Sequence, residues 1–108
     1  MSAGEGFLPN GNCLAVNAST SSVAVAMGPS ISIVVTNRSI SSPAFVTWNA
    51  SSAPTAAFPT PGDTTGVLGM EVPPGAQVTI GVNGANAFVA VVLLSGTGVV
   101  TIVPGEGL

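Results

Sequence analysis

The chain has 108 residues, of which 46% are hydrophobic and only 5% are charged, and its formal net charge at pH 7 is −3. A chain of this length forms one domain with one core, and its single Arg, without any Lys, provides no basic surface to bind the phosphates of nucleic acid. Soluble domains usually carry about a quarter charged residues, so this composition indicates a protein that works within an assembly.

Membrane insertion, a disulfide and a cofactor are not expected either. No run of about 20 apolar residues could form a membrane-spanning helix, and residues 1–12 lack the basic start and apolar centre of a secretory signal. Cys13 is the only cysteine, so it cannot form an internal disulfide, and we expect it to be a small buried hydrophobe. The chain lacks the His, Cys or carboxylate clusters that hold zinc or calcium, so no metal site is expected.

Residues 1–12 (MSAGEGFLPNGN) contain three glycines, one proline and no periodic pattern. They predict an extended N-terminal arm that precedes a domain spanning residues 13–108. Phe7 and Leu8 are the anchoring side chains of this arm. They could dock on the chain's own domain or on a neighbouring subunit, so both are candidate interaction residues.

Alternating apolar residues and regularly spaced turn residues predict strands in the rest of the chain. The expected strands are 13–17, 23–27, 31–36, 43–49, 66–72, 76–82, 85–94 and 99–103. Tight turns are expected at Gly28-Pro29, at Pro73-Pro74-Gly75 and, as a hairpin turn, at Asn83-Gly84. The longest loop spans 50–65, and no helix is expected. This pattern predicts an all-β, single-domain antiparallel β-sandwich of jelly-roll type with about eight strands.

The segment 85–104 (ANAFVAVVLLSGTGVVTIVP) organises the rest of the chain. Two apolar runs rich in β-branched residues flank Ser95-Gly96-Thr97-Gly98, which predicts a β-hairpin. In the first run Val89, Val91 and Leu93 share one face, and the alternate residues on the other face are apolar too. Either another sheet or another copy of the protein must cover the second face. We therefore expect Val89, Val91 and Leu93 to take part in self-association, as a trimer.

An enzymatic function is not expected. With no His, Tyr or Lys, the available acids and bases are Glu5, Asp63, Glu71 and Glu106. No Ser or Cys has a His partner to activate it as a nucleophile. A glycosidase needs two carboxyl groups about 5–10 Å apart, and these four lie in separate segments of the chain. We therefore expect no catalytic residue and no small-molecule substrate.

Two further patterns have competing interpretations. Asn17, Asn37 and Asn49 each begin an Asn-X-Ser sequon for glycosylation, but a chain rich in Asn, Ser and Thr produces such triplets by chance. Trp48 and Phe58 flank the long loop and could stack on a sugar ring, although a Trp on a strand more often belongs to the core. Exposure of either ring favours a binding module, whereas a structural protein could bury both.

Strand and turn segments follow one another in a characteristic order through the second half of the chain. They are Val46-Thr47-Trp48, Pro73-Pro74-Gly75 leading into Val78-Thr79-Ile80, Phe88-Val89-Ala90-Val91, and Gly96-Thr97-Gly98-Val99-Val100-Thr101-Ile102 with Pro104-Gly105-Glu106-Gly107. Over about residues 31–107 the chain resembles small virion proteins of tailed bacteriophages. In its order of strands and turns it is similar to the jelly-roll cement or decoration proteins of phage capsids.

The resemblance implies a structural virion protein that binds the major capsid protein, stabilises the head and forms a homotrimer. It also implies a location on the capsid surface, after assembly in the host cytoplasm. It assigns no catalytic or ligand-binding residue. The alternative function is a carbohydrate- or receptor-binding β-sandwich module of a phage tail or fibre.

Overall fold

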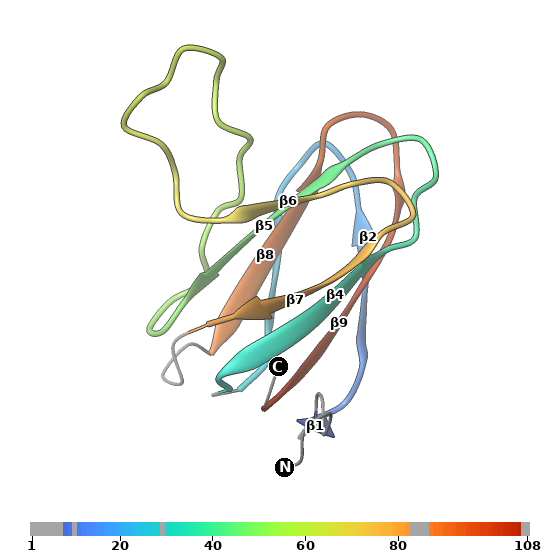
Figure 1. Ribbon diagram of the computed structural model, residues 1–108, viewed down its shortest axis with the longest axis vertical. Coiled ribbons are helices and arrows are strands. Elements are labelled where there is room, and N and C mark those ends of the chain that lie inside the picture. The colour runs from blue at the N-terminus through green and yellow to red at the C-terminus, as the bar shows by residue number, and fades with distance from the viewer. Residues whose placement is uncertain (1–7, 10, 29, 83–86, 107–108) are drawn as a thin grey trace.

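Two antiparallel sheets form the protein in the computed structural model, which describes residues 8–9, 11–28, 30–82 and 87–106 (Figure 1). The first sheet has the strand order β2 (Leu14–Ala18), β9 (Gly98–Glu106), β4 (Ser32–Asn37) and β7 (Gln77–Gly81), and the short β1 (Leu8–Pro9) pairs with the far end of β9. The second sheet has the order β3 (Val23–Ala26), β8 (Phe88–Leu93), β5 (Ala44–Asn49) and β6 (Met70–Val72). No described residue is helical, and the prediction of an all-β sandwich is confirmed.

The strand pairs are nested around the loop that joins β5 to β6. These two neighbours in the chain pair with each other, and moving outward along the chain β4 pairs with β7, β3 with β8, and β2 with β9. From β2 to β9, every connection except the one between β5 and β6 passes from one sheet to the other. The chain therefore alternates between the two layers at almost every turn.

The expected hairpin over 85–104 is wrong. Its two strands, β8 and β9, lie in different sheets, because β8 pairs with β3 and β5 while β9 pairs with β2 and β4. The hairpin expected at Asn83-Gly84 is wrong for the same reason, since β7 and β8 lie in different sheets, although that turn itself lies outside the described residues. Apolar strands joined by a glycine-rich turn look alike in sequence whether the turn stays within a sheet or crosses between sheets.

The main core lies between the two sheets. Ile33, Val35, Val100 and Ile102 from the first sheet are buried with the inward residues of the second, which are Ala44, Val46, Val72, Val89, Val91 and Leu93. Burying each large aliphatic side chain contributes about 1.5–3 kcal/mol. The outward positions of the first sheet are of both kinds: Gln77 Nε2 donates to Thr36 Oγ1 at 2.8 Å, and the half-buried Val34 lies opposite Val103. The outer face of this sheet therefore carries both polar and apolar side chains.

The second sheet is also apolar on its outer face, and the chain covers that face itself. Phe45, Ala90 and Val92 point outward from β5 and β8 and form a smaller cluster with Ala56 and Phe58 of the loop between β5 and β6. The rings of Phe45 and Phe58 lie 5.6 Å apart between centroids, at 49°. This loop, residues 50–69, is called the cover loop below. It then extends away from the sandwich, at the upper left of Figure 1.

Candidate functional site

Three of the expected interaction residues are buried in the structure. Val89, Val91 and Leu93 are at most 1% exposed, because their face of β8 packs against the first sheet. They are not accessible to another copy, and the opposite face of β8 is covered by the cover loop. Of the other two candidates, Phe7 lies outside the described residues, and the backbone of Leu8 pairs with Glu106.

The three carboxylates that the structure describes lie on different elements. Asp63 lies in the cover loop, Glu71 on the edge strand β6 and Glu106 at the end of β9, and all three are exposed. Among the described residues no group of three potential metal ligands exists, and Glu5 lies outside that part of the chain. Cys13 is exposed, so the expectation of a buried thiol is wrong.

Neither aromatic residue proposed for stacking on a sugar is freely exposed. Trp48 is partly buried against the main core, and Phe58 is partly buried against Phe45. Trp48 follows the buried Val46 and Thr47 on a central strand, while Phe58 holds the cover loop on the second sheet. Both rings therefore serve packing.

One end of the sandwich is built around a buried amide. Asn37, the last residue of β4, has no exposed surface. Its Nδ2 donates to the carbonyl oxygens of Ser42 at 2.9 Å and Val72 at 3.2 Å, and its Oδ1 accepts from the N–H of Ser39 at 3.0 Å. The amide thus joins the end of β4, the loop to β5 and the end of β6. A glycosylation enzyme has no access to it, whereas the sequon residues Asn17 and Asn49 are exposed.

Two serines extend this network to the neighbouring loops. Ser39 accepts from the N–H of Gly75 through its carbonyl oxygen at 2.9 Å, and Ser42 Oγ accepts from the N–H of Ser95 at 3.0 Å. Gly75 adopts a φ of 71°, as expected for the Pro-Pro-Gly turn. The loops 38–43, 73–76 and 94–97 are therefore bonded together at the upper end of the sandwich (Figure 1).

Apolar side chains project from this bonded end. Ile40 is 90% exposed, although the N–H groups of Ser41 and Ser42, which follow it, donate to Ser39 Oγ and order its loop. Leu94 is 60% exposed, and its N–H donates to the carbonyl of Pro43 at 3.1 Å, which places it beside the same loop. Arg38, the chain's only basic side chain, is exposed two residues before Ile40. We call Arg38, Ile40 and Leu94 the loop-end patch.

A second exposed apolar group lies where the cover loop returns to β6. Val67, Leu68 and Met70 are 48%, 63% and 43% exposed. Between them Gly69 lies so close to the second sheet that an added Cβ would be 2.6 Å from the carbonyl oxygen of Val46. We call Val67, Leu68 and Met70 the return-limb patch.

Asp63 orders the turn that precedes this limb. Its Oδ1 accepts from the Thr65 hydroxyl at 2.8 Å and from the N–H groups of Thr65 and Gly66, both at 3.0 Å. These bonds, led by that from the Thr65 hydroxyl, hold the pKa of the Asp63 carboxyl below its ordinary value of 3.8. The carboxylate therefore remains charged and holds its own turn in place.

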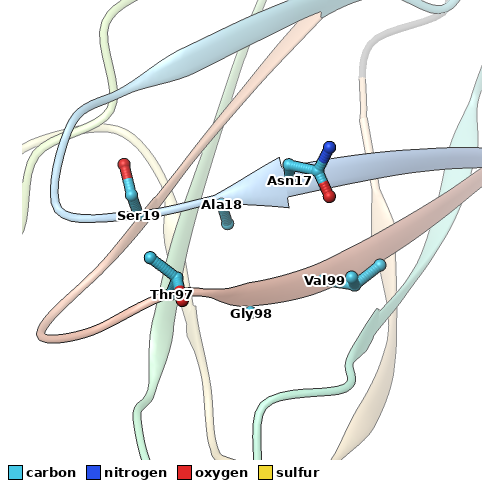
Figure 2. A pocket seen from close by; sticks show the side chains of 6 residues that line it. All are labelled: Asn17, Ala18, Ser19, Thr97, Gly98 and Val99. Carbon is cyan, nitrogen blue, oxygen red and sulfur yellow. The ribbon is translucent and has the colours of Figure 1, made fainter.

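A shallow hollow of about 450 Å³ lies between the end of β2 and the start of β9 (Figure 2). It is lined by Asn17, Ala18, Ser19, Thr97, Gly98 and Val99. These residues offer one amide and two hydroxyl groups, and no ionisable or aromatic side chain. The hollow therefore offers hydrogen-bonding groups beside the apolar side chains of Ala18 and Val99.

The comparisons with known proteins add no relative. No protein-family model matches the chain, and neither a curated protein nor a solved structure matches it. None of the described segments forms a helix long and apolar enough to cross a membrane. The candidate site is therefore defined by the loop-end and return-limb patches alone.

Proposed function

We propose that this protein is a structural virion protein, a capsid cement or decoration protein that binds the major capsid protein and stabilises the head. The observation that carries the proposal is the exposure of large apolar side chains on a surface with very few charges. Among the described residues, Ile40, Leu68 and Leu94 are at least 60% exposed. A protein that binds other subunits can bury such side chains at the contact.

The nested order of the strands supports the finer assignment to the jelly roll. A jelly roll has eight strands in two sheets, and viral capsid and lectin domains are among its members. The pairs β2–β9, β3–β8, β4–β7 and β5–β6 have the order of a long hairpin rolled into two layers. Fold alone does not decide function. The packing of Trp48 and Phe58 against the two cores favours a structural protein over the sugar-binding alternative.

Attachment to the capsid is proposed for the end of the sandwich opposite the loop-end patch. There β1 pairs with Gly105 and Glu106 of β9, at the lower end of Figure 1. We expect the N-terminal arm, residues 1–12, to extend this contact onto the capsid, with Phe7 and Leu8 as anchors. Removing residues 1–10 should leave the sandwich folded and lower its occupancy on the head.

The test uses heads of the phage whose genome encodes the protein. Full-length and truncated protein are added to heads that lack it, and bound protein is measured by co-sedimentation and located by cryo-electron microscopy. We expect full-length protein on the outer surface of the head, little truncated protein, and unchanged circular dichroism of the truncated chain. Absence of full-length protein from the head would contradict the proposal.

Salt dependence and heating provide a second readout. Attachment through apolar and backbone groups should survive molar sodium chloride, because salt screens exposed charges but does not weaken apolar burial, which sulfate strengthens. Decorated heads should also withstand heating better than stripped heads. Release by salt alone, or equal heat resistance, would argue against a cement function.

A further inference from the structure

The first sheet ends at β7, which has a neighbouring strand on one side only (Figure 1). In the described part of the chain its one partner is β4. The N–H of Asn37 donates to the Ala76 carbonyl oxygen at 2.9 Å, and the N–H of Val82 donates to the Ile31 carbonyl oxygen at 2.8 Å. Hydrogen-bonded pairs alternate with non-bonded pairs along an antiparallel ladder. The even-numbered residues from 76 to 82 therefore bond to β4.

The remaining residues of β7 direct their backbone groups away from β4. Gln77, Thr79 and Gly81 lie between the bonded positions, and all three are exposed. The Gln77 side chain bonds to Thr36 of β4, so it does not cover the free side of the strand. Within the described part of the chain, no hydrogen bond engages the outward N–H groups of these three residues. We call the outward N–H and C=O groups of Gln77, Thr79 and Gly81 the β7 edge.

We propose that the β7 edge pairs with the β7 edge of a second copy, antiparallel and across a two-fold axis perpendicular to the sheet. Thr79 then lies opposite Thr79 of the second copy, and Gln77 lies opposite Gly81. This register sets every outward N–H of one copy against a carbonyl oxygen of the other. A shift by one residue would bring outward groups against residues that already bond to β4, and would reverse the faces of the strand. A shift by two would leave an outward residue of each strand without a partner, so the edge is complementary to itself in a single register.

Side chains on both faces fit the same register. On the inner face Val78 lies opposite Ile80 of the second copy, so the half-buried Val78 at the margin of the main core gains apolar cover. On the outer face Thr79 meets Thr79, which is a favourable cross-strand pair, and Gly81 leaves room for the Gln77 side chain opposite it. β7 contains no charged residue, so no like charges oppose each other.

The other edges of the two sheets are charged or bonded. β6 has three residues with Glu71 at its centre, so two copies paired about that centre would oppose two carboxylates. On the other side of the sandwich the two sheets are joined, because the Leu93 N–H donates to the Ser19 carbonyl oxygen at 2.7 Å. There the Ala56 N–H also donates to Ser22 Oγ at 2.8 Å, which holds the cover loop beside the start of β3. β7 is therefore the edge best suited to pairing.

A second copy fits this edge better than a flexible segment of another protein. In both copies β7 is already extended and bonded to β4, so pairing orders no further backbone, whereas a flexible peptide loses conformational entropy when it becomes a strand. A contact across a two-fold axis uses the same surface on both copies and ends at a dimer. This dimer goes beyond the proposed function, and its mass distinguishes it from the homotrimer that the resemblance implies.

The first test removes one outward donor. Thr79→Pro lacks the N–H that faces the second copy but keeps the bonds from β7 to β4, and proline is tolerated at such edge positions. The control is Ala24→Pro on β3. Ala24 is exposed and directs its N–H away from β8, because the Met27 N–H donates to the Ala87 carbonyl oxygen at 2.8 Å and bonded pairs alternate from there.

Analytical ultracentrifugation of the full chain measures association from micromolar to millimolar concentration. We expect an equilibrium between monomer and dimer in the wild type. Thr79→Pro should weaken it by about tenfold or more, because the two-fold axis removes the same hydrogen bond from each copy. Ala24→Pro should associate like the wild type.

Charges at Thr79 test the register. Because Thr79 lies opposite itself, Thr79→Lys and Thr79→Glu should each weaken self-association through the repulsion of like charges. An equimolar mixture of the two should associate more tightly than either variant alone. Gln77→Lys mixed with Gln77→Glu is the control and should show no recovery of this size, since Gln77 lies opposite Gly81.

Amide hydrogen exchange locates the contact on the chain. As the protein concentration rises, exchange should slow at the outward N–H groups of Gln77, Thr79 and Gly81. It should not change at Val78 and Ile80, whose N–H groups already bond to β4.

Three results overturn the inference. They are a wild-type protein that remains monomeric at millimolar concentration, an association unchanged by Thr79→Pro, and a mixture of Thr79→Lys and Thr79→Glu that associates no better than either variant alone. Circular dichroism of each variant distinguishes lost association from lost folding. A monomer whose attachment to heads is lost in Thr79→Pro would assign the β7 edge to a capsid segment instead. A dimer that binds no head would leave this contact standing while the proposed function fails.

Discussion

Asn37 and Ser42 are joined by a hydrogen bond of 2.9 Å from the Asn37 side-chain amide to the Ser42 carbonyl oxygen, inside the sandwich. The same amide donates to the Val72 carbonyl, 35 residues away in the chain. Buried carbonyl groups that lose their donor cost about 1–3 kcal/mol each. This one side chain therefore fixes the loop end on which Ile40 is exposed.

Replacing Asn37 with Ala should lower the free energy of unfolding by about 2–4 kcal/mol, because two buried carbonyls lose their donor. Asn37→Asp should be destabilising as well, since it keeps the acceptor for the Ser39 N–H but removes the donor. Asn49→Ala is the control, because Asn49 is exposed and its Oδ1 accepts from the N–H of Ser51, two residues later in the chain. Urea denaturation measures all three, and equal effects of Asn37→Ala and Asn49→Ala would contradict the structural role.

The strands were largely predictable, because period-2 alternation marks which side chains face the core. Val89 and Val91 alternate with Ala90 and Val92 in the sequence, and the structure divides them between the two apolar clusters. The assignment of strands to sheets was not predictable from local sequence. β8 and β9 separate because β8 gains two partners in the second sheet, and those partners come from distant parts of the chain.

Gly69→Ala should destabilise the protein by about 3 kcal/mol or more. An added methyl group would contact the Phe45 ring and lie 2.6 Å from the Val46 carbonyl oxygen, so the return limb must shift. Gly66→Ala is the control. Gly66 also has a positive φ, of 74°, but has open space around it, so it should cost only about 1–2 kcal/mol of backbone strain. Thermal and denaturant unfolding compare the two, and similar losses would contradict the close contact at Gly69.

The turn at Asp63 should depend on pH. Since its hydrogen bonds lower the carboxyl pKa in the folded state, they stabilise the turn above the unfolded pKa, and this contribution is lost as the pH falls through the folded value. The amide NMR signals of Thr65 and Gly66 should therefore titrate below pH 3.8. Asp63→Asn should abolish the titration and Glu71→Gln should retain it. A titration that survives in Asp63→Asn would assign it to another group.

The candidate site was harder to predict than the fold. Ile40 stands alone among serines in Asn37-Arg38-Ser39-Ile40-Ser41, where no periodic pattern indicates its exposure. Asn37 appeared only as part of a sequon. An Asn at the end of a buried strand, directly before a Ser-rich turn, was the available signal, because such side chains bond to backbone groups of turns. The bond from Asn37 to the distant Val72, and that from Gly75 to Ser39, are visible only in three dimensions.

We expect the Phe58 ring to hold the cover loop on the second sheet. Phe58→Ala removes the ring that packs on Phe45 and uncovers the outer face of β8 at Ala90 and Val92. Because the ring is only partly buried, the free energy of unfolding should fall by about 1–3 kcal/mol, less than for a fully buried Phe. Amide hydrogen exchange should also become faster in the loop around Ala56, whose N–H donates to Ser22 Oγ at 2.8 Å.

The control is Leu68→Ala, at a 63% exposed position, whose free energy of unfolding should stay within about 0.5 kcal/mol of the wild type. Unchanged stability and exchange in Phe58→Ala would mean that the outer face does not depend on this ring, and that a second copy could cover it instead.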